Sequence, residues 1–405
     1  MTEQKSAFAI RHSAYYAAIF ANLGVYLPFM PIWLAWRDMD SVQIGIITSA
    51  PLFVRVLATP LIALWSDRQG DHRPAIIIGG WCGFVSALLL FIPSGFWPIL
   101  FLTVCFQLAT QSILPLVEAK TLAGVRRLGV DYGRMRLWGS ALFISANIAG
   151  GLVVAEYGGA SVLYMVLTTM FCTAVAAHGL PRRTGWSRGG ALPPTGCEVN
   201  NTEQEDSQAA AHAGWRDMLK LLGRPWFVAV LIAAGLIQGS HAVYYSFSAL
   251  HWEAQGITES WIGLLWALGV AAEIVLFACS GWMLAVFGAI GMLVLGGCAA
   301  FLRWLGMALD PSFAMLFPLQ CLHAFSFGAT YLGALNLVQS RVSEHNSGMA
   351  QSIHAAVSGG VFMGIMTLLA GVVFAVYGGR SFLLMAVAAG AGILVAAATL
   401  RLSDG

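Results

Sequence analysis

The chain has 405 residues, of which 58% are hydrophobic and only 10% are charged. Soluble domains carry about 25% charged residues, so this composition excludes an ordinary soluble protein and predicts one that lies in a bilayer. The net charge of +2 gives no indication of nucleic acid as a partner. The sequence shows neither a basic stripe nor a cluster of metal ligands, so no metal site is expected.

Apolar stretches long enough to cross the hydrocarbon core recur along the chain. A crossing helix needs about 20 mostly apolar residues, and about twelve windows meet this length. They lie at 12–36, 42–65, 74–93, 98–123, 136–156, 160–180, 226–250, 260–284, 286–308, 312–340, 349–377 and 380–400. The predicted fold class is therefore an all-α membrane protein with twelve transmembrane helices.

Basic residues collect in alternate loops between these spans, as the positive-inside rule expects of cytoplasmic loops. These loops carry Arg68, Arg73, Arg126, Arg127, Arg134, Arg182, Arg183, Arg188, Arg216, Lys220 and Arg224. The other set of loops carries chiefly Arg37 and Arg380. The sequence thus predicts a multi-pass protein of a bacterial cytoplasmic (inner) membrane with both termini in the cytoplasm.

A polar stretch rich in Pro and Gly, residues 181–224, interrupts the apolar spans and predicts a mobile cytoplasmic linker. It divides the chain into an N-terminal six-helix half, 1–180, and a C-terminal six-helix half, 225–405. The two halves share the pattern YGG-x-S-x-L-x-M, at 156–165 and at 376–385. Two repeated halves are typical of secondary transporters, whose substrate site lies between the halves near the midplane.

A second repeat, which pairs Tyr26 with Tyr244, places Arg55 and Glu273 at the same depth. Glu273 is the one acid in LLWALGVAAEIVLFACSG and is central in its predicted span. Ionisable groups inside the membrane are costly and functional by default. Arg55 allows two interpretations, a functional one and a structural one in which it caps backbone carbonyls. The other intramembrane ionisable residues are Glu118, Arg136, Arg303, His241, His323 and His354.

Polar side chains repeat along one face of three predicted helices, at the spacing of a helical stripe. The stripes consist of Gln107, Gln111 and Glu118, of Gln238, His241 and Tyr245, and of Gln351, His354 and Ser358. Each stripe is interpreted either as part of a wet pathway or as hydrogen bonds between helices. Aromatic residues on the first and seventh spans, Tyr26 among them, could stack on a substrate ring.

The loop after the second span reads ALWSDRQGDHR and resembles the signature of the major facilitator superfamily, G-x-x-x-D-R-x-G followed by basic residues. Asp67, Arg68, Gly70 and Arg73 match this signature, whereas Ala63 replaces its first glycine. The resemblance implies that the loop supports the switch between inward and outward states. The four matching residues are therefore expected to gate transport rather than to bind substrate.

Three further stretches, DYGRMRLWGS, GLIQGSHAVYYSFSALHW and LLWALGVAAEIVLF, resemble the phenylpropionate permease branch, which is similar to the lactose–proton symporters. The likeness of PLVEAK and GRMRLWG to those symporters implies that Glu118 binds substrate and that Arg136 pairs with it. The likeness of FLRWLG and LQCLHAFS implies a coupling role for Arg303 and for His323 in the tenth span. The resemblance also implies the twelve-helix major facilitator fold.

The tenth span departs from the symporters at two positions. Gln320 stands where they have a lysine, and Ser326 stands where they have the glutamate that carries the proton. Glu273, about one helical turn from their glutamate in the eighth span, is then the remaining carboxylate able to carry it. Low dielectric favours its neutral form and a nearby Arg303 favours its charged form, so such a site can load and release a proton.

These observations predict a secondary active transporter, a proton-coupled symporter that takes up a small organic solute, with an aromatic carboxylate such as phenylpropionate as first choice. A sugar or nucleoside symporter and a proton antiporter of the same fold remain alternatives. A membrane-embedded enzyme would need a convergent nucleophile and base or a metal cluster, and the sequence indicates neither. No cofactor is expected beyond the proton gradient, and the expected partners are the solute and the lipid bilayer, without nucleic acid or an obligatory protein partner. The predicted substrate-binding residues are Glu118, Arg136, Gln111, Tyr26, His241 and Tyr245, and the predicted coupling residues are Glu273, Arg303 and His323.

Overall fold

The computed structural model describes residues 2–92, 94–182 and 217–399, and every regular element in those ranges is helical. In chain order the elements are α1 (Thr2–Trp36), α2 (Ser41–Arg68), α3 (Arg73–Leu89), α4 (Phe96–Leu128), α5 (Tyr132–Tyr157), α6 (Ser161–Gly179), α8 (Pro225–Gly239), α9 (Ala242–Ala254), α10 (Glu259–Ala278), α11 (Ser280–Ala308), α12 (Phe313–Cys321), η1 (Ala324–Ala329), α13 (Thr330–Arg341), α14 (Glu344–His354), η2 (Ala355–Phe362), α15 (Met363–Tyr377), η3 (Gly378–Ser381) and α16 (Phe382–Ala398). η1 and η2 are π-helical and η3 is a 3₁₀ helix.

The lengths of these helices account for twelve membrane crossings. Within the described ranges, ten continuous helical stretches are long and apolar enough to cross a membrane. One of them, Asn346–Ala398, has 53 residues. That makes about 80 Å of helix, more than twice the hydrocarbon thickness of about 30 Å, and η3 divides it into two crossings. Arg73–Leu89 adds a shorter apolar helix of 17 residues. The predicted all-helical fold is thus confirmed.

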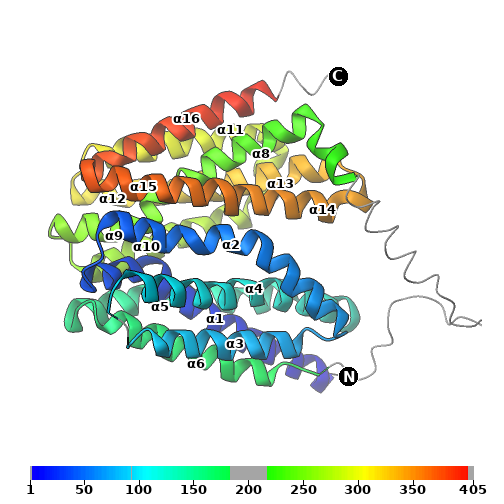
Figure 1. The fold of residues 1–405 in the computed structure, drawn as a ribbon. Helices are drawn as coiled ribbons and strands as arrows, with labels where there is room; N and C mark the ends of the chain where they lie inside the picture. The colour runs from blue at the N-terminus through cyan, green and yellow to red at the C-terminus, as the bar shows by residue number, and fades with distance from the viewer. Residues whose placement is uncertain (1, 93, 183–216, 400–405) are drawn as a thin grey trace, which may run out of the picture.

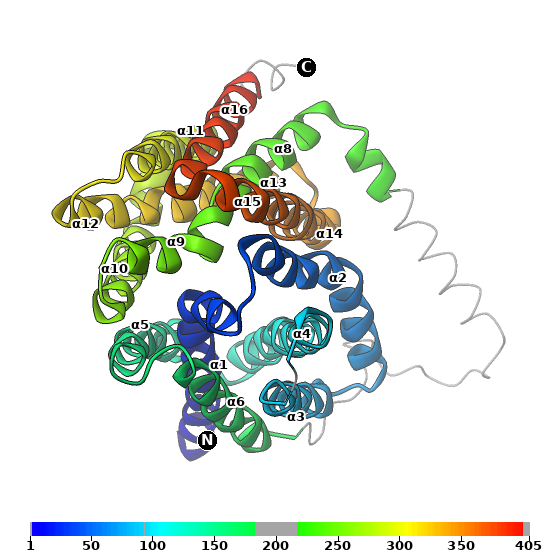
Figure 2. The same cartoon turned by 60° about the vertical axis from the view of Figure 1, so that its left-hand side comes forward.

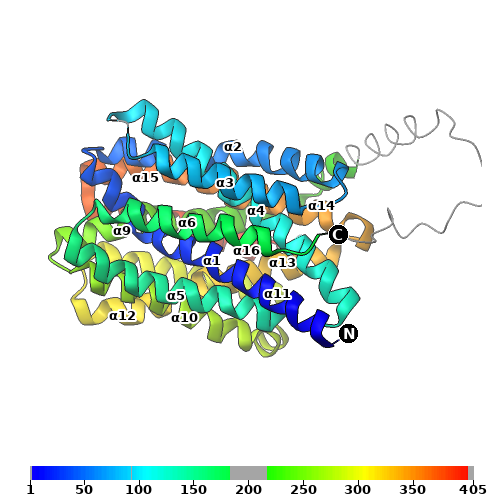
Figure 3. The same cartoon turned by 90° about the horizontal axis from the view of Figure 1, so that it is seen from below.

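The helices form two groups, and α1–α6 lie beside α8–α16 in both views of Figures 1 and 2. The start of α1 and the end of α16 point to the same end of the bundle (Figure 3). Because successive crossings alternate in direction, α2 and α4 also end there, with Arg68, Arg126 and Arg127 in their last turns. We call this the basic end and the opposite one the far end.

The shared YGG pattern ends corresponding helices in the two groups. Gly158 follows α5 with a φ of 73°, and Gly378 follows α15 with a φ of 52°. Glycine adopts positive φ at little cost, whereas residues with a Cβ are strained there. Ser161 then begins α6, and Ser381 precedes α16. The repeat seen in the sequence therefore marks the same turn in both groups.

Close contacts between the two groups lie toward the far end. A Cβ on Gly45 of α2 would lie 2.8 Å from the Cα of Gly371 of α15. A Cβ on Gly263 of α10 would lie 3.3 Å from the Cα of Gly151 of α5. Glycine lets helix backbones approach this closely inside a membrane. The two groups are therefore in direct backbone contact at the far end, through α2 with α15 and through α5 with α10.

The break at Gly288 lies within a few residues of the predicted boundary between the eighth and ninth crossings, 284–286. α10 ends at Ala278, although 260–284 was predicted to be one span. α11 is broken at Gly288, whose φ of 65° and ψ of 172° are not helical. The apolar sequence runs through both breaks, so hydropathy alone does not mark them. Glu273 lies in the last third of α10, and helical hydrogen bonds continue beyond it, from the Cys279 amide to the carbonyl of Val275 and from the Met283 amide to that of Cys279.

The predicted linker, 181–224, is partly ordered. Residues 217–222 are helical, and Lys220 forms a salt bridge of 3.0 Å with Asp217 one turn earlier. The linker therefore stays a prediction, and its C-terminal end contains this short helical segment. Its central part, residues 183–216, lies outside the described residues.

Two crossings of the second group contain a π-helical segment, a feature that is frequent at functional sites. In both segments a long polar side chain from a neighbouring helix reaches a backbone carbonyl. Gln238 of α8 donates from Nε2 to the carbonyl of Phe327 in η1 at 3.2 Å. Arg55 of α2 donates from Nη2 to the carbonyl of Gly359 in η2. The second contact joins the two groups of helices near the middle of both crossings.

Candidate functional site

The carboxylate of Glu118 is the centre of a polar cluster in the first group. Its Oε1 lies 3.3 Å from Nε of Arg136. Its Oε2 accepts hydrogen bonds from the hydroxyls of Tyr16, at 2.9 Å, and Tyr132, at 2.7 Å. The hydroxyl of Tyr16 also lies 3.1 Å from that of Thr121. Three helices, α1, α4 and α5, therefore converge on one carboxylate.

The start of α5 positions this cluster. Gly129 ends α4 in the left-handed conformation with a φ of 62°, and Asp131 caps α5 by accepting a hydrogen bond from the Arg134 amide at 3.1 Å. This tight connection keeps the first turns of α5 beside the last turns of α4. It thereby brings Arg136 back to Glu118, as the resemblance implied.

Aromatic rings flank the guanidinium of Arg136. Its Cζ lies 3.9 Å from the ring centroid of Phe20 and 5.6 Å from that of Tyr16, both within cation–π distance. Arg136 remains 30% exposed and Glu118 26% exposed, so a solute can reach the pair. Tyr132 was not predicted from the sequence, yet it stands four residues before Arg136, a spacing that puts both on one helix face.

Arg303 is the centre of the second cluster and has no exposed surface. Its Nη1 lies 3.0 Å from Nδ1 of His323, and its Nη2 donates to Oε1 of Gln320 at 2.6 Å. Its Cζ lies 4.3 Å from the ring centroid of Tyr244 and 4.6 Å from that of Trp304. Gln320 stands where the resembling symporters have a lysine. A lysine offers no acceptor for Arg303, so the glutamine fits this packing.

His323 connects Arg303 with Glu273. An arginine nitrogen can only donate, so Nδ1 of His323 accepts and the neutral ring carries its hydrogen on Nε2. That nitrogen lies 3.8 Å from Oε2 of Glu273, longer than a direct hydrogen bond but close enough for a small movement to form one. We call Arg303, His323 and Glu273 the coupling chain; it runs from α11 through the tenth crossing to α10.

His241 lies beside the coupling chain. It has no exposed surface, and both ring nitrogens have partners. Nδ1 lies 3.1 Å from the carbonyl of Gln238, and Nε2 lies 3.1 Å from the hydroxyl of Ser326. Its ring centroid is 5.6 Å from that of His323. The structure thus groups His241 with the predicted coupling residues and not with the Glu118 cluster, and its role as a substrate ligand stays a prediction.

Tyr245 belongs to an aromatic cluster next to the coupling chain. Its ring centroid lies 5.7 Å from that of His241 and 6.0 Å from that of Trp266. Tyr244 stacks on Trp266 at 4.5 Å, and both are almost fully buried. Tyr245 is only partly buried, so it is the member of this cluster that a solute ring can contact.

Two predicted substrate residues lie outside both clusters. Tyr26 is 5% exposed and stacks on Phe106 at 5.2 Å, so it packs within the first group in this conformation. Gln111 is partly buried and makes no side-chain hydrogen bond with any described residue. It stands seven residues before Glu118, two turns along the same face of α4, and its amide is available to a ligand.

The loop between α2 and α3 is anchored within the first group. Arg73 donates from Nε to the carbonyl of Leu180 at 2.7 Å and from Nη2 to that of His178 at 2.8 Å. Asp67 is 64% exposed, and its Oδ1 lies 3.7 Å from Nε2 of His72. Arg73 therefore fixes the loop to the end of α6, whereas Asp67 lies at the surface of the basic end.

A short ion pair in this region joins two residues that were not predicted. Nζ of Lys120 lies 2.7 Å from Oδ1 of Asp71, and the two side chains are 8% and 21% exposed. The pair ties the loop to α4 two residues after Glu118. Gly70 supports the turn with a φ of 72°, and Arg68 is exposed at the end of α2. The signal in the sequence was the position of Asp71 inside the matched loop.

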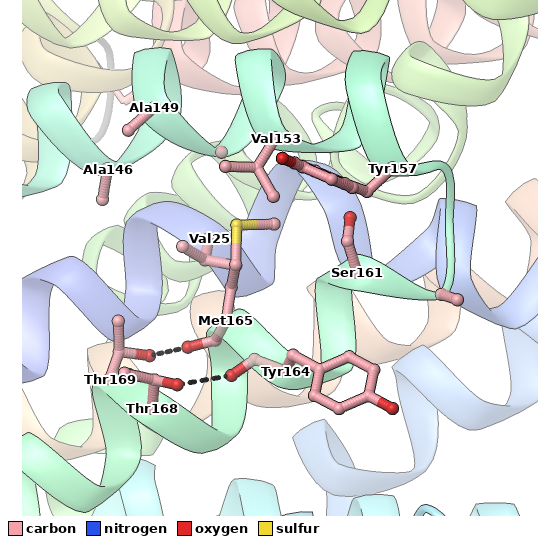
Figure 4. A pocket seen from close by; sticks show the side chains of 12 residues that line it. Val25, Ala146, Ala149, Val153, Tyr157, Ser161, Tyr164, Met165, Thr168 and Thr169 are labelled. Atoms are coloured by element: carbon pink, nitrogen blue, oxygen red, sulfur yellow. Dashed lines mark hydrogen bonds between the residues drawn. The ribbon is translucent and has the colours of Figure 1, made fainter.

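An apolar cavity of about 590 Å³ lies apart from both clusters, between α1, α5 and α6. Figure 4 shows its lining side chains, among them Val25, Val153, Ser161 and Met165. None of the lining residues is charged. Tyr157 and Tyr164 at its edge are 73% and 63% exposed. The cavity therefore opens on the outer surface of the bundle and is not the candidate solute site.

Comparison with known proteins gives consistent matches along the chain. The family described as "MFS_1 like family" matches residues 9–385. A probable 3-phenylpropionic acid transporter of Escherichia coli (strain K12) is 29% identical over 380 residues, which cover 92% of this chain and 93% of that protein. Maltose permease of Geobacillus stearothermophilus is 25% identical over 362 residues, which cover 88% of this chain and 85% of that protein.

Solved structures show the same fold at low sequence identity. The nucleoside transporter NupG superposes with a TM-score of 0.79 at 15% identity and covers 98% of both chains. A bacterial homologue of the human lysosomal transporter Spinster, in an inward-facing and unoccupied conformation, gives a TM-score of 0.73 at 14% identity, also over 98% of both chains. The helical fold, the loop signature and the family match over most of the chain agree. This chain belongs to the MFS_1-like family of the major facilitator superfamily, a family of membrane transporters and not of enzymes.

Proposed function

We propose that this protein is a proton-coupled symporter that takes up a small organic solute, with an aromatic carboxylate such as phenylpropionate as first choice. The observation that carries the proposal is the coupling chain, in which a buried arginine orders a histidine toward Glu273. Burying ionisable groups in a membrane costs free energy. A chain of ionisable groups that ends on a carboxylate supports ion coupling.

Glu273 is the proton carrier in this proposal. His323 cannot gain a proton at Nδ1 without setting that N–H against Arg303, so the proton goes to the carboxylate. As a carboxylate, Glu273 can draw in the Nε2 hydrogen of His323. As a neutral carboxyl, it tolerates the low dielectric of the bundle. The alternation of these two states with access to either side would couple proton entry to solute entry.

The Glu118 cluster orients the solute. Glu118 engages Nε of Arg136, and both side chains are partly exposed. A guanidinium suits a carboxylate, and the Arg–Glu pair with the hydroxyls of Tyr16 and Tyr132 also suits polar groups. The relative that is 29% identical is described as a probable 3-phenylpropionic acid transporter, which supports an aromatic carboxylate as the first substrate to test.

The arrangement of the two groups supports an inward-open state. Close backbone contacts lie at the far end, as at Gly45 with Gly371. The basic end is cytoplasmic in this proposal, because the positive-inside rule assigns Lys and Arg to that side. The protein would then lie in the cytoplasmic membrane with both termini inside. It would need no cofactor beyond the proton gradient and no protein partner.

Uptake of radiolabelled 3-phenylpropionate into proteoliposomes tests this function. An inward proton gradient should drive accumulation above the external concentration, and a protonophore should abolish it. Accumulation that is driven instead by an outward proton gradient would indicate the antiporter, in which a proton leaves as the solute enters. Uptake that does not depend on the proton gradient would rule out proton coupling.

A sugar is the second candidate substrate. The relative described as maltose permease is 25% identical over most of the chain, and an Arg–Glu pair also suits sugar hydroxyls. Maltose added in excess to the same proteoliposomes should leave 3-phenylpropionate uptake unchanged. Strong inhibition by maltose would favour the sugar instead.

A further inference from the structure

Arg55 lies near the middle of α2 and faces the interior of the bundle. Thr48 stands seven residues earlier, on the same helix face, and its hydroxyl lies 3.5 Å from that of Ser246 of α9 in the other group. The residues that face outward lie on the opposite side of α2 and include Leu57, Leu61 and Leu64, which are 73%, 64% and 56% exposed. Arg55 is partly buried. Its guanidinium is therefore directed between the two groups and not toward lipid.

The one described partner of Arg55 is a backbone carbonyl, that of Gly359 in η2. A carbonyl offers only a partial negative charge. The same crossing carries two more polar atoms, Nε2 of His354 and Oγ of Ser358, which are buried and lack hydrogen-bond partners among the described residues. A full positive charge and unpaired polar atoms at mid-depth are costly, and an anionic ligand would reduce that cost.

The arginines and acids of the two clusters and of α2 leave one cation in excess. Three arginines, Arg55, Arg136 and Arg303, stand against two acids, Glu118 and Glu273, so these five residues carry a net charge of +1 when both acids are ionised. Glu118 is paired with Arg136. The chain from Arg303 through His323 leads to Glu273. Within the described part of the chain, Arg55 is the arginine of this set that has no acid beside it.

We propose that Arg55 receives the carboxylate of the transported solute and thereby selects acids over neutral compounds of the same shape. This inference rests on the proposed function, because it assumes that the solute is an aromatic carboxylate. A guanidinium has five N–H donors, so it can hold a carboxylate through two of them and keep its contact with Gly359. Arg136 then orients the solute next to a charge that Glu118 already balances.

The test compares 3-phenylpropionate with its neutral amide, 3-phenylpropanamide, by calorimetry on the purified full-length protein. The wild-type protein should bind the acid more tightly. Arg55→Gln keeps a neutral hydrogen-bond donor at this position but removes the charge. It should weaken acid binding roughly 10- to 150-fold, the range for a hydrogen bond to a charged group, and leave amide binding nearly unchanged. Arg55→Lys should retain much of the preference. Arg380→Gln, the same change at an exposed position of η3, should have no effect.

Different outcomes of this experiment would overturn this inference and the proposed function. If Arg55→Gln weakens acid and amide equally, Arg55 is structural. If the preference for the acid survives in Arg55→Gln but disappears in Arg136→Gln, Arg136 is the carboxylate ligand. In both cases the inference is overturned and the proposed function stands. If the wild-type protein binds neither compound, the proposed substrate class fails and the role of Arg55 fails with it.

Discussion

The Nη1 atom of Arg303 lies 3.0 Å from Nδ1 of His323, and this contact decides which imidazole nitrogen carries the hydrogen. Because arginine cannot accept, the neutral ring presents Nε2–H to Glu273. The carboxylate is then the group of the coupling chain that can gain and lose a proton without breaking the contact with Arg303.

Glu273→Gln should abolish proton-driven accumulation but preserve exchange of labelled for unlabelled solute at equal pH. The amide cannot take a proton, yet it fills the same space beside His323. Both activities are measured in proteoliposomes loaded with solute. Accumulation at the wild-type level would show that another group carries the proton.

Gln320→Lys, which introduces the residue of the resembling symporters, should destabilise the protein. It removes the acceptor of the 2.6 Å hydrogen bond from Arg303 and adds a second buried cation. The lost acceptor alone costs about 1–3 kcal/mol, so Tm should fall by several degrees. Gln320→Glu keeps an acceptor and adds a counter-charge, and it serves as the control. Equal Tm values for the two variants would contradict this account.

Arg136→Ala should weaken solute binding by at least roughly 10-fold, because it leaves Glu118 without its ion partner. The pair is partly exposed, so the loss should be smaller than for a fully buried pair. Tyr132→Phe removes one hydrogen bond to the same carboxylate and should cost less, about 1 kcal/mol. Calorimetry with 3-phenylpropionate measures both, and an unchanged affinity in Arg136→Ala would exclude the cluster from binding.

Asp71→Asn should slow turnover more than Asp67→Asn. Asp71 pairs with the almost buried Lys120 at 2.7 Å, whereas Asp67 is mostly exposed and lies 3.7 Å from His72. Both variants should bind solute within a few-fold of wild type, because the loop lies at the basic end. Initial uptake rates, normalised to protein in the membrane, provide the measurement. A full wild-type rate in both variants would reduce the loop to a topological anchor.

Gly371→Val should weaken the far-end contact and shift the protein toward an outward-open state. A Cβ at Gly371 would lie 2.9 Å from the Cα of Gly45, so the side chain must push the helices apart. Spin-label distances between the far ends of α2 and α15 should lengthen. Gly281→Val is the control, because a Cβ there meets no atom within 4 Å. Unchanged distances in Gly371→Val would show that this contact does not hold the far end closed.

The sequence by itself determined the class of fold. A helix must have enough apolar residues to cross a bilayer of fixed thickness, so the crossings follow from local composition. The YGG repeat related the two halves, and the structure shows that it marks the same positive-φ turn at Gly158 and Gly378. Apolar length alone did not mark the end of α10, since the apolar sequence continues past Ala278, whereas the break at Gly288 is at a glycine with positive φ.

Only the tertiary structure decided which side chains meet. The resemblance named Glu118 and Arg136, but the hydroxyls of Tyr16 and Tyr132 reach that carboxylate because α1, α4 and α5 converge. The same holds for Lys120 with Asp71, 49 residues apart in the chain.

His241 was predicted as a substrate residue, but the packing of distant helices places it beside the coupling chain. Its stripe on the seventh span fixed the helix face, whereas the packing of η1 supplied Ser326 as its partner. Periodicity reports the direction in which a side chain leaves its own helix. The partner it finds there depends on how distant helices pack, and no local pattern contains that information.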